Sequence, residues 1–262
     1  MTPSAIKTLP TGHVGKQIRI YDRVDSTNEM ALAESGEVAS AGTVWLAREQ
    51  TAGRGQYGRS WQAPRDTSVL MSVLLFPPFD LRRPAILTAC AAVAVCDTVA
   101  ALIGTKPSIK WPNDILLAGK KVCGILCEQR TLPHMQNGIA CVVGIGLNVG
   151  QSQQMFADAG LPDAASLASL SGQSIEWEEA ADALILNLDR HYDCVLRGSL
   201  DAVENHWRNA LGLEGRTVVA IAGEQCFRGR LTSLGFDGID LELAGGAHKR
   251  LSPESIRQLR IE

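Results

Sequence analysis

The sequence predicts an α+β fold in which a mixed β-sheet with helices on one face is followed by a small β-barrel. Near-continuous apolar runs at residues 69–76 and 139–147 have the length and composition of buried strands. The apolar run 85–103 and the amphipathic stretch 177–196 have helical lengths, so helices alternate with strands and cover the sheet. From residue 213 onward short strands alternate with glycine turns, which is typical of a small barrel.

The length of 262 residues allows one large domain and one small one. We expect a flexible N-terminal segment over residues 1–16, where prolines and glycines are frequent. The main domain is expected over residues 17–212 and the small domain over residues 213–262. A core of about fifty residues is marginal by itself, so the small domain should pack against the main one.

Composition argues against several classes of protein. A net charge of −3 gives no reason to expect a general polyanion-binding surface. Residues 1–16 lack the apolar core of a signal peptide. The run 85–103 contains Asp97 and two threonines, so we expect a buried helix that ends near Gly104 and not a membrane span. The seven cysteines are expected to be buried free thiols of a cytoplasmic protein without a membrane partner.

The first elements follow from alternation and from capping signals. Ile18–Tyr21 alternates apolar and polar residues, as a half-buried strand does. A helix should begin at Asp25–Glu29 and end near Gly36, because Ser26 and Glu29 have the spacing of a capping box. A helix N-terminus also offers free N–H donors to a ligand, so capping and ligand binding are both compatible with this segment.

Prolines and tight turns set the limits of the strands in the middle of the chain. Pro77 ends the strand at 69–76, and Pro112 ends a short strand at 109–111. The strands expected after it, separated by turns, are residues 115–117, 121–128 and 139–147.

The last third of the chain divides into a loop, two helices and the barrel strands. Residues 150–170 are polar and aperiodic, so we expect a surface loop with one short helix, placed to act as a lid. Helices are expected at 177–196 and 200–211, separated by Gly198. The barrel strands are expected at Thr217–Ile221, Gln225–Leu231, Ile239–Leu243 and His248–Leu251.

The stretch Gln50–Trp61, which we call the glycine-arginine loop, carries the strongest signal for a binding site. Three glycines and the arginines Arg54 and Arg59 lie within seven residues, between the apolar segment 43–47 and the strand at 69–76. Glycines let backbone N–H groups approach an anion, and arginine forks hold it through two hydrogen bonds. From the glycine content alone, a long hairpin turn with solvated arginines is an equal alternative.

Four other segments accompany this loop and carry a resemblance. They are Asp25-Ser26-Thr27-Asn28, Lys110-Trp111-Pro112-Asn113-Asp114, Lys121-Val122-Cys123-Gly124-Ile125-Leu126-Cys127-Glu128 and Val143-Gly144-Ile145-Gly146-Leu147-Asn148. In this order and spacing, together with the glycine-arginine loop, the chain closely resembles the biotin protein ligases. The resemblance runs from about Ile18 to the C-terminus.

The resemblance implies a fold and a reaction. The expected fold is a class II synthetase-like catalytic domain followed by an SH3-like barrel. In the family, the carboxylate of biotin attacks the α-phosphate of ATP to give biotinyl-5′-adenylate and pyrophosphate. Biotin is then transferred to a lysine of a biotin carboxyl carrier protein domain. Mg²⁺ enters with ATP, no resident metal site is expected, and the family contains both monomers and homodimers.

The resemblance also assigns roles to individual residues. Lys110 and Arg54 are the expected catalytic residues. The residues expected to bind biotin are Ser26, Thr27, Gln50, Gly53, Arg54, Gln56, Trp61, Lys110, Gly124 and Gly144. Those expected to bind the nucleotide are Arg54, Arg59, Lys110, Trp111, Asn113 and Asn148.

The chemistry explains why cations should gather in this site. Two anions must approach each other to form the adenylate, so positive charges must be fixed where negative charge develops. Lys110, Arg54 and Arg59 supply them from separate segments. A lysine ammonium acts as a point charge that can reach both the carboxylate and the α-phosphate. Lys110 is therefore the first candidate for a catalytic residue. The alternatives are a solvated strand-end lysine, a core position for Trp61 and tight strand packing for Gly124.

The chain departs from the family pattern at Gln56. Family loops commonly carry a third basic residue there. We expect either weaker retention of the adenylate or a transfer of this task to Arg54, Arg59 and Lys110.

Three other functions compete with the ligase hypothesis. A lipoate or octanoate transferase shares the implied fold, but its arginine-rich segment followed by three glycines and a histidine is absent. A non-catalytic biotin-binding or nucleotide-binding module would not need Lys110 and Arg54. A DNA-binding regulator is the weakest alternative, because too few residues precede Ile18 for a helix-turn-helix domain, and no nucleic-acid partner is expected. The acceptor protein and the adenine contacts stay open, with Phe156 and Trp177 as the aromatic candidates for the latter.

Overall fold

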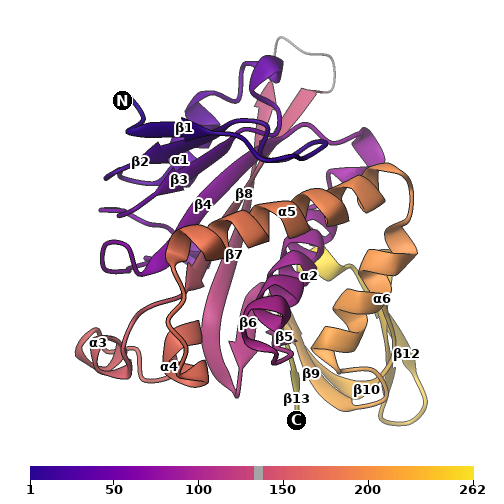
Figure 1. Ribbon diagram of the computed structural model, residues 1–262. Helices are drawn as coiled ribbons and strands as arrows, with labels where there is room; N and C mark the ends of the chain where they lie inside the picture. Colours follow the sequence, from indigo (N-terminus) through magenta and orange to yellow (C-terminus); the bar gives the residue numbers. More distant parts are fainter. Residues whose placement is uncertain (133–137) are drawn as a thin grey trace.

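The computed structural model describes residues 1–132 and 138–262 and contains a large and a small β-sheet (Figure 1). The strands of the large sheet are β1 (Ala5–Lys7), β2 (Ile18–Tyr21), β3 (Val44–Ala47), β4 (Ser68–Leu75), β5 (Ser108–Lys110), β6 (Asp114–Leu117), β7 (Lys120–Leu132) and β8 (Gly138–Asn148). Their order is β1-β2-β3-β4-β8-β7-β6-β5. β2 pairs with β3 in parallel and the other pairs are antiparallel, so the predicted mixed sheet is confirmed.

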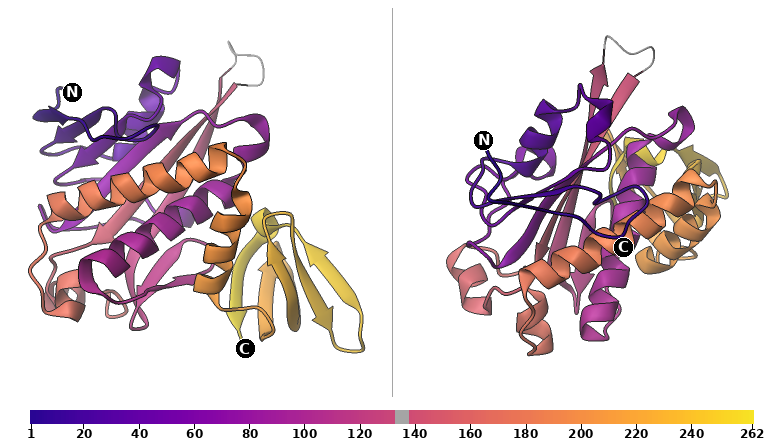
Figure 2. Two further views of the ribbon diagram at one scale, coloured as in Figure 1. Left: turned by 45° about the vertical axis from the view of Figure 1, so that its right-hand side comes forward. Right: turned by 45° about the horizontal axis from the view of Figure 1, so that its top comes forward.

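Helices cover both faces of the large sheet. The helices are α1 (Thr27–Ala33), α2 (Pro84–Ile103), α3 (Gln153–Asp158), α4 (Leu167–Ser171), α5 (Trp177–Leu196) and α6 (Leu200–Leu211), with short 3-10 turns η1 (Val38–Ser40), η2 (Gln56–Gly58), η3 (Phe79–Leu81) and η4 (Pro253–Ser255). α2 and α5 lie side by side across one face (Figure 2). α1 packs on the opposite face, where Ala31 contacts the cluster that contains Trp45 and Leu74. The prediction of helices on one face was therefore wrong for α1, because side-chain alternation along the central strands leaves apolar residues on both faces.

Helix α2 is the centre of the main core. Among the described residues it is the helix long and apolar enough to cross a membrane, but 67% of its most apolar stretch is buried in the protein. It ends at Gly104, whose φ of 71° is the left-handed conformation that terminates helices. The seven cysteines are free, and burial raises the pKa of Cys90 on this helix to about 12, so it remains a thiol.

The N-terminal segment is more ordered than its prolines and glycines predict. β1 pairs with β2 in antiparallel fashion. The carboxylate of Asp189 on α5 accepts hydrogen bonds from the backbone N–H groups of Gly12, His13 and Val14, the last two at 2.7 Å. Val14 is fully buried. A carboxylate far along the chain thus fixes residues 12–14, which lie outside any helix or strand.

The small sheet is antiparallel and has one strand more than the sequence predicts. Its strands are β9 (Thr217–Ala222), β10 (Gln225–Gly235), β11 (Gly238–Leu243), β12 (His248–Leu251) and β13 (Ile256–Ile261), in the order β12-β11-β10-β9-β13. β13 lies beside β9, so the C-terminal residues complete this sheet. In the described part of the chain no pairing joins β12 to β13, and the sheet is not closed into a barrel.

Aromatic side chains join the small sheet to the rest of the protein. Trp207 on α6 stacks on Phe236 with ring centroids 5.3 Å apart and lies 5.6 Å from Trp111. The Trp111 indole N–H donates a 2.9 Å hydrogen bond to the carbonyl oxygen of Ile256 in β13. Residues of both sheets belong to one continuous apolar cluster. The small sheet is therefore packed against the main core, as the size argument predicts.

Candidate active site

A cavity of about 470 Å³ lies on the face of the large sheet that carries α1. Most of the predicted site residues line it: Ser26, Thr27, Gln50, Arg54, Gln56, Arg59, Trp61, Lys110, Trp111, Asn113, Gly124 and Gly144. Among the predicted residues, Gly53 and Asn148 do not. Segments separated by more than a hundred positions thus meet around one hollow.

The sheet itself provides the floor of this cavity. Along β7 and β8, large apolar residues such as Ile125 and Ile145 belong to the core beneath α2. Gly124, Gly144 and Gly146 alternate with them and therefore face the other side. The strands consequently present large side chains to the core, and on the other face their glycines leave space for side chains from neighbouring segments.

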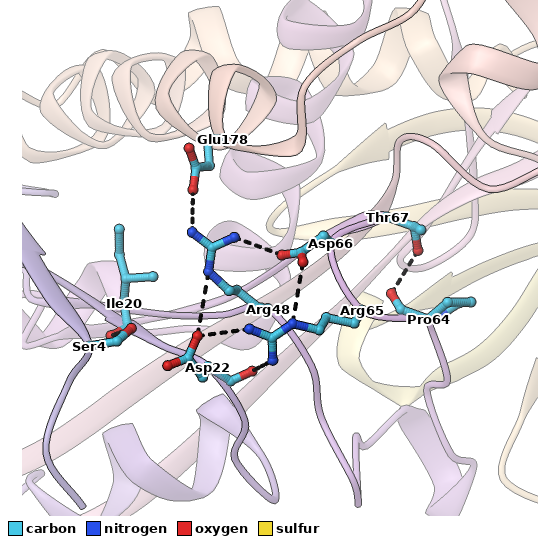
Figure 3. Close-up of polar contacts among 9 residues, drawn as sticks. All are labelled: Ser4, Ile20, Asp22, Arg48, Pro64, Arg65, Asp66, Thr67 and Glu178. Carbon is cyan, nitrogen blue, oxygen red and sulfur yellow. Dashed lines mark hydrogen bonds and ion pairs between the residues drawn. The ribbon is translucent and has the colours of Figure 1, made fainter.

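An ion-pair network fixes the two ends of the glycine-arginine loop (Figure 3). Arg48, just before the loop, donates hydrogen bonds to Asp66 at 2.9 Å and to Glu178 of α5 at 2.8 Å. Arg65, just after it, binds Asp22 at 2.8 Å and Asp66 at 3.3 Å. Exposed single pairs contribute little, but several charges that share partners restrain a loop base more effectively. The network holds the base of the loop against the sheet and α5.

Gly53 lies at a close crossing within the glycine-arginine loop. A Cβ at this position would overlap the backbone carbonyl oxygen of Trp61 and lie 3.0 Å from the side-chain nitrogen of Gln50. The N–H of Trp61 donates a 2.8 Å hydrogen bond to the Gly53 carbonyl, so the loop crosses over itself here. The role of Gly53 in this structure is this close crossing.

A chain of polar side chains runs from the loop across the start of α1. The side-chain oxygen of Gln50 accepts hydrogen bonds from the Thr27 N–H at 2.7 Å and the Thr27 hydroxyl at 3.1 Å. The Ser72 hydroxyl on β4 bonds to Thr27 at 2.7 Å and to Asn28. Asn28 in turn donates a 2.7 Å hydrogen bond to Glu128. Asn28 and Ser72 were not predicted as site residues, although Ser72 is a polar residue in an apolar strand and needs a partner when buried.

Arg54 is paired with two carboxylates. Its guanidinium contacts Glu29 on α1 and Glu128 on β7. Ser26 stands at the N-cap position of α1 but makes no capping hydrogen bond, and Glu29 is engaged by Arg54. The capping-box prediction for Ser26 and Glu29 was therefore wrong. Glu128 and Glu29 balance the charge of Arg54, so a bound anion must either share Arg54 with them or displace them.

Trp61 lies flat on the glycine floor. A Cβ at Gly146 would overlap its indole, and one at Gly124 would lie 2.9 Å from it. The Lys121 ammonium is 5.7 Å from the indole centre and forms a 2.6 Å ion pair with Asp114. Lys121 and Asp114 also line the cavity and were not predicted. Trp61 is thus a wall of the cavity, and the space above Gly124 is filled by its ring.

Gly144 makes room for a side chain of the protein itself. A Cβ there would overlap the amide of Asn28, which crosses β8 at this point. The glycines that the resemblance assigns to the ring system of biotin are therefore covered here by Trp61 and Asn28, and the ligand would lie above these two side chains.

Three cations in the cavity wall form no ion pair or side-chain hydrogen bond in residues 1–132 and 138–262. They are Lys110 at the end of β5, Arg59 in the glycine-arginine loop and Arg257 on β13. Lys110 is exposed to solvent and pairs with Asp114 only through the backbone ladder. These three charges are available to an anion without breaking an existing contact.

The two asparagines among the predicted nucleotide-binding residues both form hydrogen bonds within the protein. Asn113 lines the cavity, but its amide donates a 2.6 Å hydrogen bond to the Ile125 carbonyl and ties β6 to β7. Asn148 lies outside the cavity, where its amide binds the Ala165 carbonyl at 3.1 Å and Gln151 at 3.1 Å. It anchors the segment after β8 and does not face the site.

The aromatic candidates for adenine also lie elsewhere. Phe156 on α3 and Trp177 on α5 are both 5% exposed and do not line the cavity. The expected loop of residues 150–170 contains two short helices, α3 and α4, and its backbone pairs with Lys121. Tyr57, 63% exposed at the rim, is an aromatic residue that does line the cavity and that was missed.

The small sheet contributes to the site as well. Arg257 and Gln258 of β13 line the cavity. A second cavity of about 210 Å³ adjoins the first, because Gln56, Tyr57 and Trp111 line both. The short, mixed pattern of β13 did not predict a strand, so its part in the site was missed.

Comparisons with known proteins agree with this architecture. The model of the biotin/lipoate A/B protein ligase family matches residues 20–148. A biotin–[acetyl-CoA-carboxylase] ligase of Mycobacterium tuberculosis is 32% identical over 248 residues, covering 82% of this chain and 91% of that protein. The enzyme of the same name from Paracoccus denitrificans is 32% identical over 240 residues, covering 88% and 95%. A bifunctional ligase/repressor of Bacillus spizizenii is 32% identical over 232 residues, covering 88% of this chain and 70% of that protein.

Solved structures show the same fold. The biotin protein ligase of Aquifex aeolicus, in complex with biotin and ATP, superposes with a TM-score of 0.74 at 24% identity, covering 94% of this chain and 99% of that one. The chain belongs to the biotin/lipoate A/B protein ligase family, and its curated relatives place it among the biotin protein ligases.

Proposed function

We propose that the chain is an ATP-dependent biotin ligase that forms biotinyl-5′-adenylate and pyrophosphate and then transfers biotin to a lysine of a biotin carboxyl carrier protein domain. One observation carries the proposal. In a chain that is 32% identical to named biotin ligases, the predicted biotin and nucleotide segments converge on one cavity that holds unpaired cations.

The proposed chemistry uses the arrangement of charges in the cavity. Lys110 and Arg59 are free to neutralise the biotin carboxylate and the α-phosphate as they approach. Arg54 joins them when the incoming anion competes with Glu29 and Glu128. Mg²⁺ carried in with the triphosphate would neutralise further charge there. After adenylation, Lys110 stabilises the phosphate of the departing AMP while the acceptor amine attacks the mixed anhydride.

The walls of the cavity position the uncharged part of biotin. The start of α1 offers Ser26 and Thr27 to the ureido ring, next to the indole of Trp61. Supporting this placement, Gln50, Ser72 and Thr27 are already locked in one hydrogen-bonded chain, so little ordering is required on binding.

The proposal extends to the small sheet, the domain limits, the location and the oligomeric state. The small sheet is proposed to be the SH3-like element of the family, supported by its five antiparallel strands and by its place at the C-terminus. Its two residues in the cavity wall, Arg257 and Gln258, support a role for this element at the site. A cytoplasmic location, the domain limits at residues 16 and 212, and a monomer or homodimer are likewise predictions.

The test is exchange of labelled pyrophosphate into ATP by the purified chain, with biotin, lipoate and octanoate compared as acids. Exchange with biotin only would support the ligase, because the reverse of adenylation requires the acyl-adenylate. Exchange with lipoate or octanoate would move the protein to the sister activity. Tight biotin binding without any exchange would leave only a binding module.

Gln56 provides a prediction about retention of the intermediate. Gln56 lines both cavities and carries no charge. A substitution Gln56→Arg adds a fixed cation near the proposed phosphate position, so we expect the adenylate to leave the enzyme about tenfold more slowly, as for about 1.4 kcal/mol of added binding. The measurement is release of radiolabelled adenylate after rapid dilution, with Gln258→Arg as the control for a cation added elsewhere in the wall. Equal release rates for wild type and Gln56→Arg would refute the idea.

A further inference from the structure

A second cluster of chemically reactive side chains lies where three helices meet, outside the cavity of the proposed ligase. Asp97 comes from α2, His191 from α5 and His206 from α6. These helices pack pairwise against one another. None of the three residues lines either cavity, so the reaction proposed above makes no use of them.

The spacing of the three side chains is close to that of a metal site. The His191 Nε2 atom is 2.7 Å from Oδ2 of Asp97, and the His206 Nε2 atom is 3.6 Å from Oδ1. The three ligand atoms lie within 4.8 Å of one another. Ligand atoms of a tetrahedral zinc ion are about 3.3 Å apart, since Zn–N and Zn–O bonds are about 2.0–2.2 Å long. Small side-chain rotations of the half-exposed His206 would bring the three donors to this spacing.

The position of His206 is not explained by hydrogen bonding. Its distance of 3.6 Å from the carboxylate is beyond a hydrogen bond, and among the described residues its ring makes none. The rings of His191 and His206 meet edge to face with centroids 6.2 Å apart. His206 therefore faces the Asp97 carboxylate and the His191 imidazole without a hydrogen bond to either.

We propose that Asp97, His191 and His206 bind a divalent transition-metal ion of the zinc type, with water in the remaining position. Two imidazoles and one carboxylate are a donor set that suits Zn²⁺ and Co²⁺. Arg190 binds the Asp97 carboxylate at 2.6 Å and would orient it as an outer partner. The ion would join α2, α5 and α6. On α6, His206 directly precedes Trp207, which lies at the junction of the two sheets.

The experiment is titration of the EDTA-treated, full-length chain with Co²⁺, followed by displacement with Zn²⁺. We expect one Co²⁺ per chain, with weak visible bands of nitrogen and oxygen ligation and without the thiolate charge-transfer band that the cysteines would give. Asp97→Asn and His206→Asn should each weaken binding by tenfold or more, because loss of a direct ligand costs at least as much as loss of an outer partner, about 10–100-fold. Asp97→Asn keeps hydrogen-bonding capacity, and His206 is 39% exposed in its side chain, so both variants should fold.

The matched control is His248→Asn, a histidine on β12 outside the cluster. It should bind Co²⁺ as the wild type does. The proposal is overturned if millimolar Co²⁺ produces no spectrum, if thiolate bands appear, or if His206→Asn binds as tightly as His248→Asn. A hydrogen-bonded network that only joins the helices would give the first or the last of these results. Because metal binding is read directly, none of these outcomes depends on whether the chain ligates biotin.

Discussion

Replacing Lys110 by alanine is expected to lower biotin-dependent pyrophosphate exchange by about 10²–10³-fold, mostly through kcat. Lys110 lies in the cavity wall at the end of β5, is exposed, and has no ionic partner in the described part of the chain. No carboxylate of the protein neutralises its charge. The ammonium can therefore stabilise the negative charge that develops when the carboxylate oxygen of biotin attacks the α-phosphorus. Initial rates over a range of biotin and ATP concentrations would separate kcat from KM.

A nearby lysine supplies the control for this substitution. Lys106 is exposed in the turn before β5 and does not line the cavity, so Lys106→Ala should exchange at the wild-type rate. The variant Lys110→Arg keeps the charge but replaces a compact ammonium by a planar fork, and should recover only part of the rate. If Lys110→Ala retained the activity of Lys106→Ala, adenylation would have to rely on the arginines alone.

Replacing Trp207 by alanine is expected to lower the free energy of unfolding by about 3–5 kcal/mol. The ring is 2% exposed, stacks on Phe236 and touches Trp111, so its removal opens a cavity between the main core and the small sheet. Urea unfolding followed by circular dichroism would measure the loss. Because Trp111 lines the active-site cavity and is held by Ile256 of β13, the variant should also bind ATP or biotin more weakly.

The control for this prediction is a large apolar residue on a neighbouring helix. Leu186 on α5 is 42% exposed, and Leu186→Ala should change stability by less than about 0.5 kcal/mol. Trp207→Phe keeps an aromatic ring against Phe236 and should lose less than Trp207→Ala. A loss below about 1 kcal/mol for Trp207→Ala would mean that the two sheets are joined by other contacts.

The sequence pattern correctly predicted those elements that are determined by neighbouring residues. The helices at Trp177–Leu196 and Leu200–Leu211 were predicted with the limits that the structure has, because an apolar stripe and flanking glycines define them. The strand β13 was missed because its pattern is short and mixed, and it exists through pairing with β9. The N-terminal segment was expected to be flexible from its prolines and glycines. Its order was missed because the carboxylate that holds it, Asp189, lies far along the chain.

The same distinction holds for the site. By itself the sequence determined which segments take part, since the glycine-arginine loop and the segment that begins at Lys110 carry their chemistry in consecutive residues. Only the tertiary structure decided how charges are shared. Arg54 meets Glu128 across 74 positions, while Lys110 meets no partner in the described residues. Pairing of charges depends on distances in space. These distances are set by packing on both faces of the sheet, and the periodicity of a single segment does not encode them.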